Sequence, residues 1–204
     1  RTDKYGGKTM KERATLTLEI FRRIKEACGQ DFLIESQISA FEEYPGYTVA
    51  DFLDYCKLCE GLVDIFQVRG WDGSTTHANG HNAVKGQPYT LQFAEAFKKR
   101  NIKALVSPVG TFGNPDDIER FIAEGKTDLV SIARAFIADH KYGEKIAEGR
   151  GEDIVPCLLC NICHSSFCAV NPEAGYAHVI DRLYRKPERK KKVAVIGGGP
   201  AGMR

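Results

Sequence analysis

The sequence predicts an α/β fold built from repeated strand–helix units, and two observations support this. Apolar runs typical of buried strands alternate with amphipathic segments along the first 150 residues. The connections between them are short, as expected when parallel strands are joined by helices that pack on a sheet. Apolar residues make up 43% and charged residues 27% of the 204-residue chain, the balance of an ordinary globular protein.

Five helices and four strands are expected in this region. In the first helix, Leu16, Ile20 and Ile24 recur at a helical spacing. Asn114 as a cap and Pro115 at the first helical position mark the start of another helix. The expected helices are 10–27, 48–61, 88–100, 114–125 and 139–148, and the expected strands are 31–39, 62–68, 102–110 and 127–134.

The expected strands are almost continuously apolar, which predicts a parallel sheet buried on both faces. Repeated units of this kind form either a closed barrel or an open doubly wound sheet. A complete eight-stranded barrel takes about 250 residues. Since four strands occupy about 150 residues here, a barrel would be present only by half.

Charge and hydropathy bear on the partners and the compartment. The formal net charge of +2 is too small to predict nucleic acid or an anionic membrane as the main partner. No apolar run approaches the roughly 20 residues of a membrane helix, and no signal peptide opens the chain. We expect a cytoplasmic protein. We also expect both ends to lie inside a longer polypeptide, because the chain starts at Arg1 and stops within a glycine motif.

Residues 151–180 contain four of the seven cysteines, within twelve positions. The run PCLLCNICHSSFCAVNP has the spacing Cys-x2-Cys-x2-Cys-x4-Cys. Four thiolates in a compact loop suit a [4Fe–4S] cluster, with a zinc site or unligated thiols as the alternatives. The expected ligands are Cys157, Cys160, Cys163 and Cys168. Cys56 and Cys59 lie in a predicted helix and are interpreted as small apolar side chains.

A second motif follows a basic linker at 181–192. In VAVIGGGPAG, Gly197, Gly199 and Gly202 match G-x-G-x-x-G directly after a β-branched strand. Such glycines allow a tight turn and the close approach of a pyrophosphate to a helix N-terminus. Residues 193–204 are therefore predicted to begin a dinucleotide-binding domain, with a ligand-free glycine turn as the alternative.

The loops after the third and fourth strands are candidates for a phosphate site, provided that these strands are the last two of a barrel. Gly110 would offer its backbone N–H and Arg134 its guanidinium fork. A salt bridge from Arg134 to a neighbouring carboxylate is the alternative.

Together these segments resemble the iron–sulfur branch of the old yellow enzyme family. RTDKYGG at 1–7, SIARAFIAD at 131–139, the cysteine run and VAVIGGGPAG occur in the family's order. The branch includes 2,4-dienoyl-CoA reductase, 2-enoate reductase and trimethylamine dehydrogenase. The resemblance implies that 1–150 is the C-terminal half of an FMN-binding (β/α)8 TIM barrel. The cluster loop and the first strand and turn of a Rossmann-like FAD/NAD(P) domain would follow.

The function that this resemblance implies is an NADH:flavin oxidoreductase of the ene-reductase type. Electrons would pass from NAD(P)H through FAD (or an ADP-binding relative of that domain) and the cluster to FMN. FMN hydride would then reduce the activated C=C bond of an enoate, enone or dienoyl-CoA. An amine dehydrogenase of the trimethylamine dehydrogenase type and a non-enzymatic zinc-stabilised or electron-transfer module remain alternatives. The substrate, NADH versus NADPH, the direction of electron flow and any homo-oligomer stay open.

Matching to the family also implies roles for single residues. Gly110, Ala133 and Arg134 fall on FMN-phosphate positions. Gln37 falls where relatives carry an arginine that contacts the pyrimidine edge of FMN. Since Gln37 keeps a hydrogen-bond donor but has no charge, we expect a less stabilised anionic reduced flavin.

The catalytic proton donor is not assigned within the chain. The family's substrate-binding pair on the fourth strand would lie upstream of Arg1, and Asp72 stands where dienoyl-CoA reductase has a histidine. His77 and His81 lie in the loop after the second visible strand, on the catalytic face of a barrel. They are the candidates within the chain, and an ordinary polar surface loop is the alternative.

Overall fold

The computed structural model describes residues 2–42, 46–70, 83–84, 87–176, 178–180, 188–199 and 202. The strands are β1 (Glu35–Ser39), β2 (Ile65–Arg69), β3 (Ala83–Val84), β4 (Gln87–Pro88) and β5 (Leu105–Pro108). The helices are α1 (Met10–Arg13), α2 (Thr15–Cys28), α3 (Val49–Leu58), α5 (Leu91–Lys99), α6 (Pro115–Ala123), α7 (Arg134–Ala138) and α8 (Tyr142–Ala147). Two 3₁₀ turns, η1 (Gly151–Asp153) and η2 (Ile162–Ser165), flank the first cysteines of the loop.

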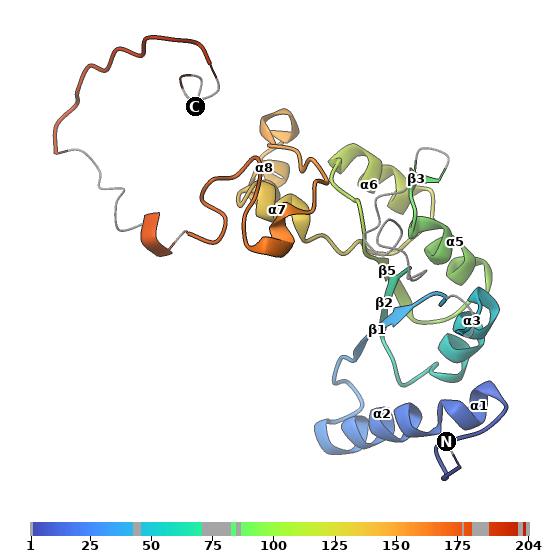
Figure 1. The fold of residues 1–204 in the computed structure, drawn as a ribbon. Helices are drawn as coiled ribbons and strands as arrows, with labels where there is room; N and C mark the ends of the chain where they lie inside the picture. The colour runs from blue at the N-terminus through green and yellow to red at the C-terminus, as the bar shows by residue number, and fades with distance from the viewer. Residues whose placement is uncertain are drawn as a thin grey trace.

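Three strands form a parallel sheet in the order β1–β2–β5. The register places Gln37 beside Gln67 and Gln67 beside Ser107. Helices α3, α5 and α6 lie on one side of these strands (Figure 1). Parallel neighbours joined by helices are the α/β arrangement that the sequence predicts. The antiparallel pair β3–β4, between β2 and α5, was not predicted.

The prediction of a fourth strand at 127–134 is wrong, because these residues do not form a continuous strand. Only Ser131 forms a bridge, parallel to Val109. The backbone N–H groups of Leu129 and Ser131 still donate to the carbonyls of Val106 (3.1 Å) and Pro108 (3.0 Å). The segment therefore runs beside β5 but is too briefly paired to form a full strand, and Arg134 begins α7 instead of ending a strand.

Two predicted helices differ from those in the structure. The helix expected at 10–27 is divided at Ala14, because Thr9 and Glu12 form a capping box for the short α1 and Ala14 then caps α2. The helix expected at 139–148 is shortened to α8. Asp139 has an extended backbone (φ −138°, ψ 101°), so the helical turn stops there and starts again at Tyr142.

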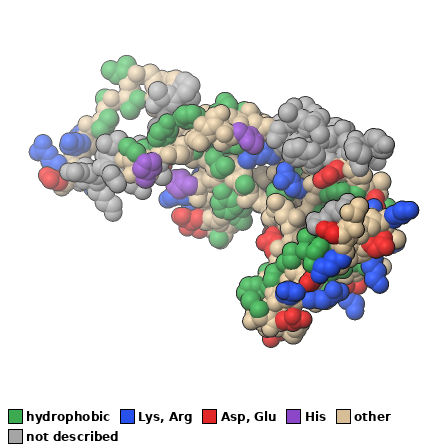
Figure 2. Space-filling model, turned by 60° about the horizontal axis from the view of Figure 1, so that its bottom comes forward, with side chains coloured by type: hydrophobic (Ala, Val, Ile, Leu, Met, Phe, Trp, Pro, Cys, Tyr) green, Lys and Arg blue, Asp and Glu red, His purple; other side chains and the backbone are tan. Residues whose placement is uncertain are grey.

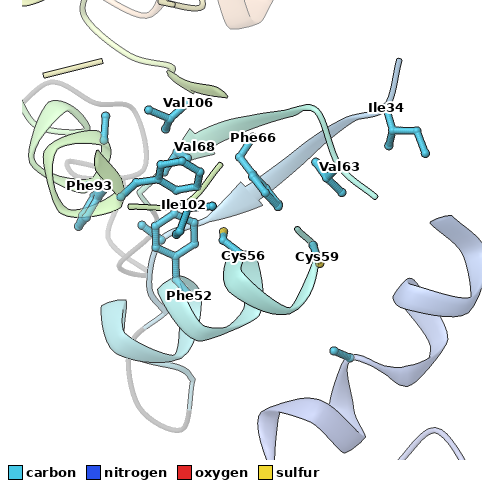
Figure 3. Packing of buried hydrophobic residues seen from close by; sticks show 14 of the residues in the cluster. Ile34, Phe52, Cys56, Cys59, Val63, Phe66, Val68, Phe93, Ile102 and Val106 are labelled. Atoms are coloured by element: carbon cyan, nitrogen blue, oxygen red, sulfur yellow. The ribbon is translucent and has the colours of Figure 1, made fainter. Parts of the chain in front are cut away.

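The core fills the space between the sheet and helices α3 and α5 (Figure 3). Phe66 on β2 contacts Phe97 on α5 with ring centroids 5.7 Å apart, and Phe52 on α3 lies 6.4 Å from the same ring. All three rings are fully buried, which makes them a main source of hydrophobic stabilisation. Cys56 and Cys59 are also fully buried, as the apolar interpretation predicts.

The expectation that both faces of the sheet are buried is wrong. Phe66 and Val68 point into the core, whereas Gln67 and Arg69 alternate with them and stay half-buried on the opposite face. On that face Leu105 is 45% exposed. Successive strand residues point to opposite faces, and the polar residues Gln67 and Arg69 of β2 both fall on this second face, so only the first face of β2 is fully buried.

The outer surface carries interspersed acidic and basic side chains with apolar patches between them on the face drawn in Figure 2. This mixture agrees with the small net charge. Across the described parts of the chain, no helix combines the length and the apolar character needed to cross a membrane.

The strand expected at the start of the dinucleotide-binding motif is absent from the described residues 188–199, which extend away from the rest of the chain (Figure 1). Val193, Val195 and Ile196 are 80%, 65% and 100% exposed. A strand needs a neighbour for its backbone hydrogen bonds, and this segment has none within the described residues. The glycine turn does form, because the N–H of Gly202 donates to the carbonyl of Gly199 at 2.9 Å.

A buried lysine offers a test of this packing. Lys25 is 5% exposed, and its ammonium donates to the carbonyl of Phe32 (2.7 Å) and to Asp64 (3.0 Å). We expect Lys25→Met to destabilise the protein by about 2–3 kcal/mol, because these acceptors lose their partner. The exposed pair of Lys57 with Glu60 is the control, and Lys57→Met should cost less than about 1 kcal/mol. Urea unfolding measures both, and equal effects would contradict the assignment.

Candidate functional site

A cavity of about 400 Å³ lies at the carboxyl ends of the parallel strands. Gln37 comes from β1, Gly110 follows β5, and Ala133 and Arg134 follow the segment beside β5. The structure therefore brings together in one cavity all four residues assigned to the flavin from the sequence. Their roles as ligands stay predictions, but the carboxyl ends of parallel strands are where sites of this fold class lie.

Thr90, just before α5, is a residue of this cavity that the sequence did not reveal. It is 2% exposed, and its hydroxyl has no hydrogen-bond partner within the described part of the chain. A Cβ added to Gly110 would lie 3.1 Å from this oxygen. A buried hydroxyl without a partner is costly and rare, so its place beside Gly110 fits a cavity shaped for a polar ligand.

Gln37 is held by a row of amides on the polar face of the sheet. Its Nε2 donates to Oε1 of Gln67, and Nε2 of Gln67 donates to Glu35 at 3.2 Å. Arg69, at the end of β2, also lines the cavity. The strand ends thus provide amide and guanidinium groups to the cavity that Arg134 also lines.

Arg134 lies between this cavity and a second one. Its Nη1 donates to Oδ1 of Asn161 at 3.0 Å. The sequence left a phosphate ligand and a carboxylate partner as alternatives for this guanidinium. The structure shows one contact of this guanidinium with a neutral amide of the cysteine loop, that of Asn161.

The second cavity is lined by all four predicted ligands, Cys157, Cys160, Cys163 and Cys168. The N–H of Leu159 donates to Sγ of Cys157 at 3.4 Å. Within the ranges that the structure describes, no three His, Cys, Asp or Glu side chains are arranged to hold a metal ion. Four soft sulfur donors around one cavity, with a backbone donor to one of them, fit the chemistry of a [4Fe–4S] cluster.

The backbone of the loop is held in unusual conformations. Leu159, Asn161 and Ser166 have φ values of 56°, 61° and 67°. Asparagine tolerates the left-handed region, but for a bulky residue such as Leu159 it is a genuine outlier. Strain of this kind persists where the surroundings fix it and is concentrated at functional sites.

Both ends of the cysteine loop are fixed to the segment around α7. Asp139 accepts hydrogen bonds from Nζ of Lys145 (2.6 Å) and from the N–H of Val155 (3.0 Å), just before the first cysteine. Asn171, beyond the last cysteine, donates to the carbonyl of Ile137 at 2.8 Å. Because α7 also carries Arg134, the loop is held at a fixed place relative to the first cavity.

Some of these residues could not be found from a pattern. Asn161, Asp139 and Asn171 lie inside segments that were singled out in the sequence, but no pattern there predicted their contacts, and Thr90 lies in no motif. His164 is exposed, and it also borders the flavin cavity. Asp72, His77 and His81 lie outside the described residues, so their roles stay predictions.

Comparison with known proteins assigns the chain to a family. A family model described as "NADH:flavin oxidoreductase / NADH oxidase family" matches residues 1–153. The chain belongs to this family. Its fold is part of the TIM-barrel fold of old yellow enzyme-type oxidoreductases.

Three similar proteins illustrate the range of the family. An NADH oxidase from Thermoanaerobacter brockii is 37% identical over 216 residues, which cover 100% of this chain and 32% of that protein. A 2-naphthoyl-CoA reductase in complex with 2-naphthoyl-CoA matches with a TM-score of 0.83 and 32% identity, covering 100% of this chain and 32% of that one. Histamine dehydrogenase from Rhizobium sp. 4-9 matches with a TM-score of 0.78 and 29% identity, covering 100% and 31%. The chain spans about a third of the length of these relatives.

The carboxylate of Asp139 gives the cysteine loop a pH dependence. Burial alone would raise its pKa, but hydrogen bonds from Lys145, Val155 and Lys141 outweigh burial and hold the pKa below the usual 3.8. Its stabilising contribution is therefore present above about pH 3.8 and is lost as the pH falls through the lower folded-state pKa.

We expect Asp139→Asn to destabilise the protein by about 3 kcal/mol at pH 7, because Lys145 is left buried without its partner. Below pH 3.8 the difference from the unsubstituted protein should shrink. Urea unfolding between pH 3 and pH 7 measures this. Asp153→Asn, which removes an exposed pair with Arg150, is the control and should cost less than about 1 kcal/mol. A difference between Asp139→Asn and the unsubstituted protein that does not change with pH would be evidence against this account.

Proposed function

We propose that the chain belongs to a flavin- and iron–sulfur-dependent oxidoreductase that uses NAD(P)H to reduce an activated C=C bond. One observation carries the proposal: the cavity of the flavin residues and the cavity of the four cysteines share a wall. Arg134, Ile137 and Cys163 line both. Groups bound in the two cavities would be close neighbours, as electron transfer between them requires.

The first cavity is proposed to hold FMN. The backbone of Gly110, the hydroxyl of Thr90 and the guanidinium of Arg134 would bind its phosphate, with Ala133 beside them. Gln37 would donate a hydrogen bond to the pyrimidine edge. The flavin supplies hydride transfer when it is bound, while the chain orients it and adjusts the charge around it.

The second cavity is proposed to hold a [4Fe–4S] cluster on Cys157, Cys160, Cys163 and Cys168. The cluster supplies one-electron transfer when it is bound. The N–H of Leu159 would stabilise negative charge on the thiolate of Cys157, to which it already donates. The fixed ends of the loop would hold the thiolates at a constant place beside the flavin cavity.

The domain organisation is part of the proposal. Residues 1–150 would supply half of the FMN barrel, 151–180 the cluster loop and 181–192 a linker. Residues 193–204 would begin the FAD- or ADP-binding domain, with Gly197, Gly199 and Gly202 at the pyrophosphate. A Cβ on Gly202 would lie 2.0 Å from the carbonyl oxygen of Gly197, so the turn that has formed requires glycine there.

A second candidate is an amine dehydrogenase. The similarity to histamine dehydrogenase along the whole chain favours it, whereas the greater similarity to 2-naphthoyl-CoA reductase favours the reductase. The cavities and their lining residues serve either direction of electron flow, so the two candidates are separated by substrate.

The test uses the full-length protein that contains this chain, isolated without oxygen. We expect FMN, iron and acid-labile sulfide, and NADH-dependent reduction of an enone, an enoate or an unsaturated acyl-CoA. Oxidation of amines without reduction of any alkene would favour the second candidate. A colourless protein with neither flavin nor iron, or one that contains only zinc, would overturn both.

The hydroxyl of Thr90 gives a separate prediction. We expect Thr90→Val to stabilise the flavin-free protein by about 1 kcal/mol, because it removes a buried group without a partner. The same change should weaken FMN binding. Thr127 is the matched control: it is equally buried, but its hydroxyl donates to the carbonyl of Val106 at 3.0 Å, so Thr127→Val should destabilise. Thermal unfolding and flavin titration measure both. A less stable flavin-free Thr90→Val protein would contradict the prediction.

The neutral side chain of Gln37 gives a further testable prediction, about the redox potential of the flavin. We expect Gln37→Arg to raise the midpoint potential of bound FMN by roughly 30 mV, because a charged donor stabilises the anionic reduced ring by about 1.4 kcal/mol more than an amide does. Arg100→Gln, which removes an exposed arginine paired with Asp54, should leave the potential unchanged. A redox titration followed by flavin absorbance measures the midpoint potential in each variant. An unchanged potential in Gln37→Arg would refute a contact between residue 37 and the flavin ring.

A further inference from the structure

We infer that Asn161, in the cysteine loop, positions Arg134 to bind the phosphate of the flavin. This inference rests on the proposed function. It gives the cysteine loop a second role besides binding a cluster. Through Asn161, the loop orients Arg134 in the neighbouring cavity before the phosphate binds.

The contact itself is direct and partly buried. Nη1 of Arg134 donates to Oδ1 of Asn161 at 3.0 Å. A guanidinium is planar and carries five N–H donors in a rigid fork. One hydrogen bond to one edge of this rigid fork therefore restricts the orientation of the whole group.

The positions of Arg134 and Asn161 relative to the two cavities indicate what their contact does. Arg134 lines the flavin cavity and the cysteine cavity, whereas Asn161 lines the cysteine cavity only. Asn161 can therefore act on a ligand in the flavin cavity through Arg134, which it contacts directly. Ala133 and Gly110 line the same cavity as Arg134, and under the proposed function these three residues bind the flavin phosphate.

The backbone of the loop presents the amide to Arg134. Asn161 has a φ of 61°, a left-handed conformation that asparagine adopts readily and most other residues do not. It lies between Cys160 and Cys163 in the sequence. An asparagine thus meets two requirements at this position: it allows the turn between the cysteines and supplies the acceptor for Arg134.

The physical effect is preorganisation. A free arginine side chain has several flexible torsions, and a ligand that must order it loses affinity. Since Asn161 already orders Arg134, the phosphate meets a fixed guanidinium. Removing the amide should weaken the binding of a flavin that carries a phosphate. The binding of a flavin without a phosphate should be unaffected.

The experiment compares FMN with riboflavin, which lacks the phosphate, on the full-length protein freed of its flavin. Asn161→Gly keeps the left-handed backbone and removes the acceptor. We expect the Kd for FMN to rise about tenfold and the Kd for riboflavin to change less than about twofold, both measured by flavin fluorescence. Asn101→Gly is the matched control, because Asn101 also has a positive φ (52°) but lines neither cavity; it should change neither constant.

Two further measurements separate positioning from a general loss of structure. In an Arg134→Met background, Asn161→Gly should have no further effect on FMN affinity, as expected when one residue acts through the other. The iron content per chain of Asn161→Gly should equal that of the unsubstituted protein.

Three results would overturn the inference: an unchanged FMN affinity in Asn161→Gly, an equal loss of both flavins, or a loss of iron together with FMN. The last two would show that Asn161 only maintains the loop. If the unsubstituted protein binds neither flavin, the proposed function fails, and this inference fails with it.

Discussion

The parallel register of β1, β2 and β5 is the constraint on which the rest of the structure depends. It brings the carboxyl ends of all three strands to one edge, where the loops that follow them meet. Helices α3 and α5 cover one face of the sheet (Figure 1) and bury Phe66 and Val68 against it. The other face is left to the polar side chains of Gln37, Gln67 and Arg69. One arrangement therefore produces both the hydrophobic core and a cavity with a polar wall.

The cysteine loop is joined to this edge at three points. Asp139 holds the segment before the first cysteine, Asn171 holds the segment after the last, and Asn161 contacts Arg134. All three points lie on or next to α7, a helix of only five residues. Because α7 also contributes to the wall of the first cavity, the two cavities share a boundary. The proposed transfer of electrons between them depends on this shared boundary more than on any single ligand.

Membership of the NADH:flavin oxidoreductase / NADH oxidase family narrows the chemistry without fixing the substrate. The relatives reported above include proteins named as an oxidase, a reductase and an amine dehydrogenase. The residues that this chain contributes to the first cavity are proposed to bind and orient a flavin whichever of these reactions applies. The sequence predicts that Asp72, His77 and His81 lie at the catalytic end of the barrel, where we expect the choice of substrate to be made. Those three positions are outside the described residues.

The sequence alone determined the order of the strands and helices, the four cysteines with their spacing, and the glycine turn. These features depend on local patterns: helical or strand periodicity, capping residues and fixed motif spacings. Local patterns could not show that residues 127–134 pair too briefly to form a strand, or that residues 193–197 need neighbouring strands to become one. They also could not show that Thr90 lies beneath Gly110, or that Arg134 contacts Asn161, 27 residues further along the chain. Such contacts join residues that are distant in sequence, so they were decided by how the strands and the cysteine loop pack together in the tertiary structure.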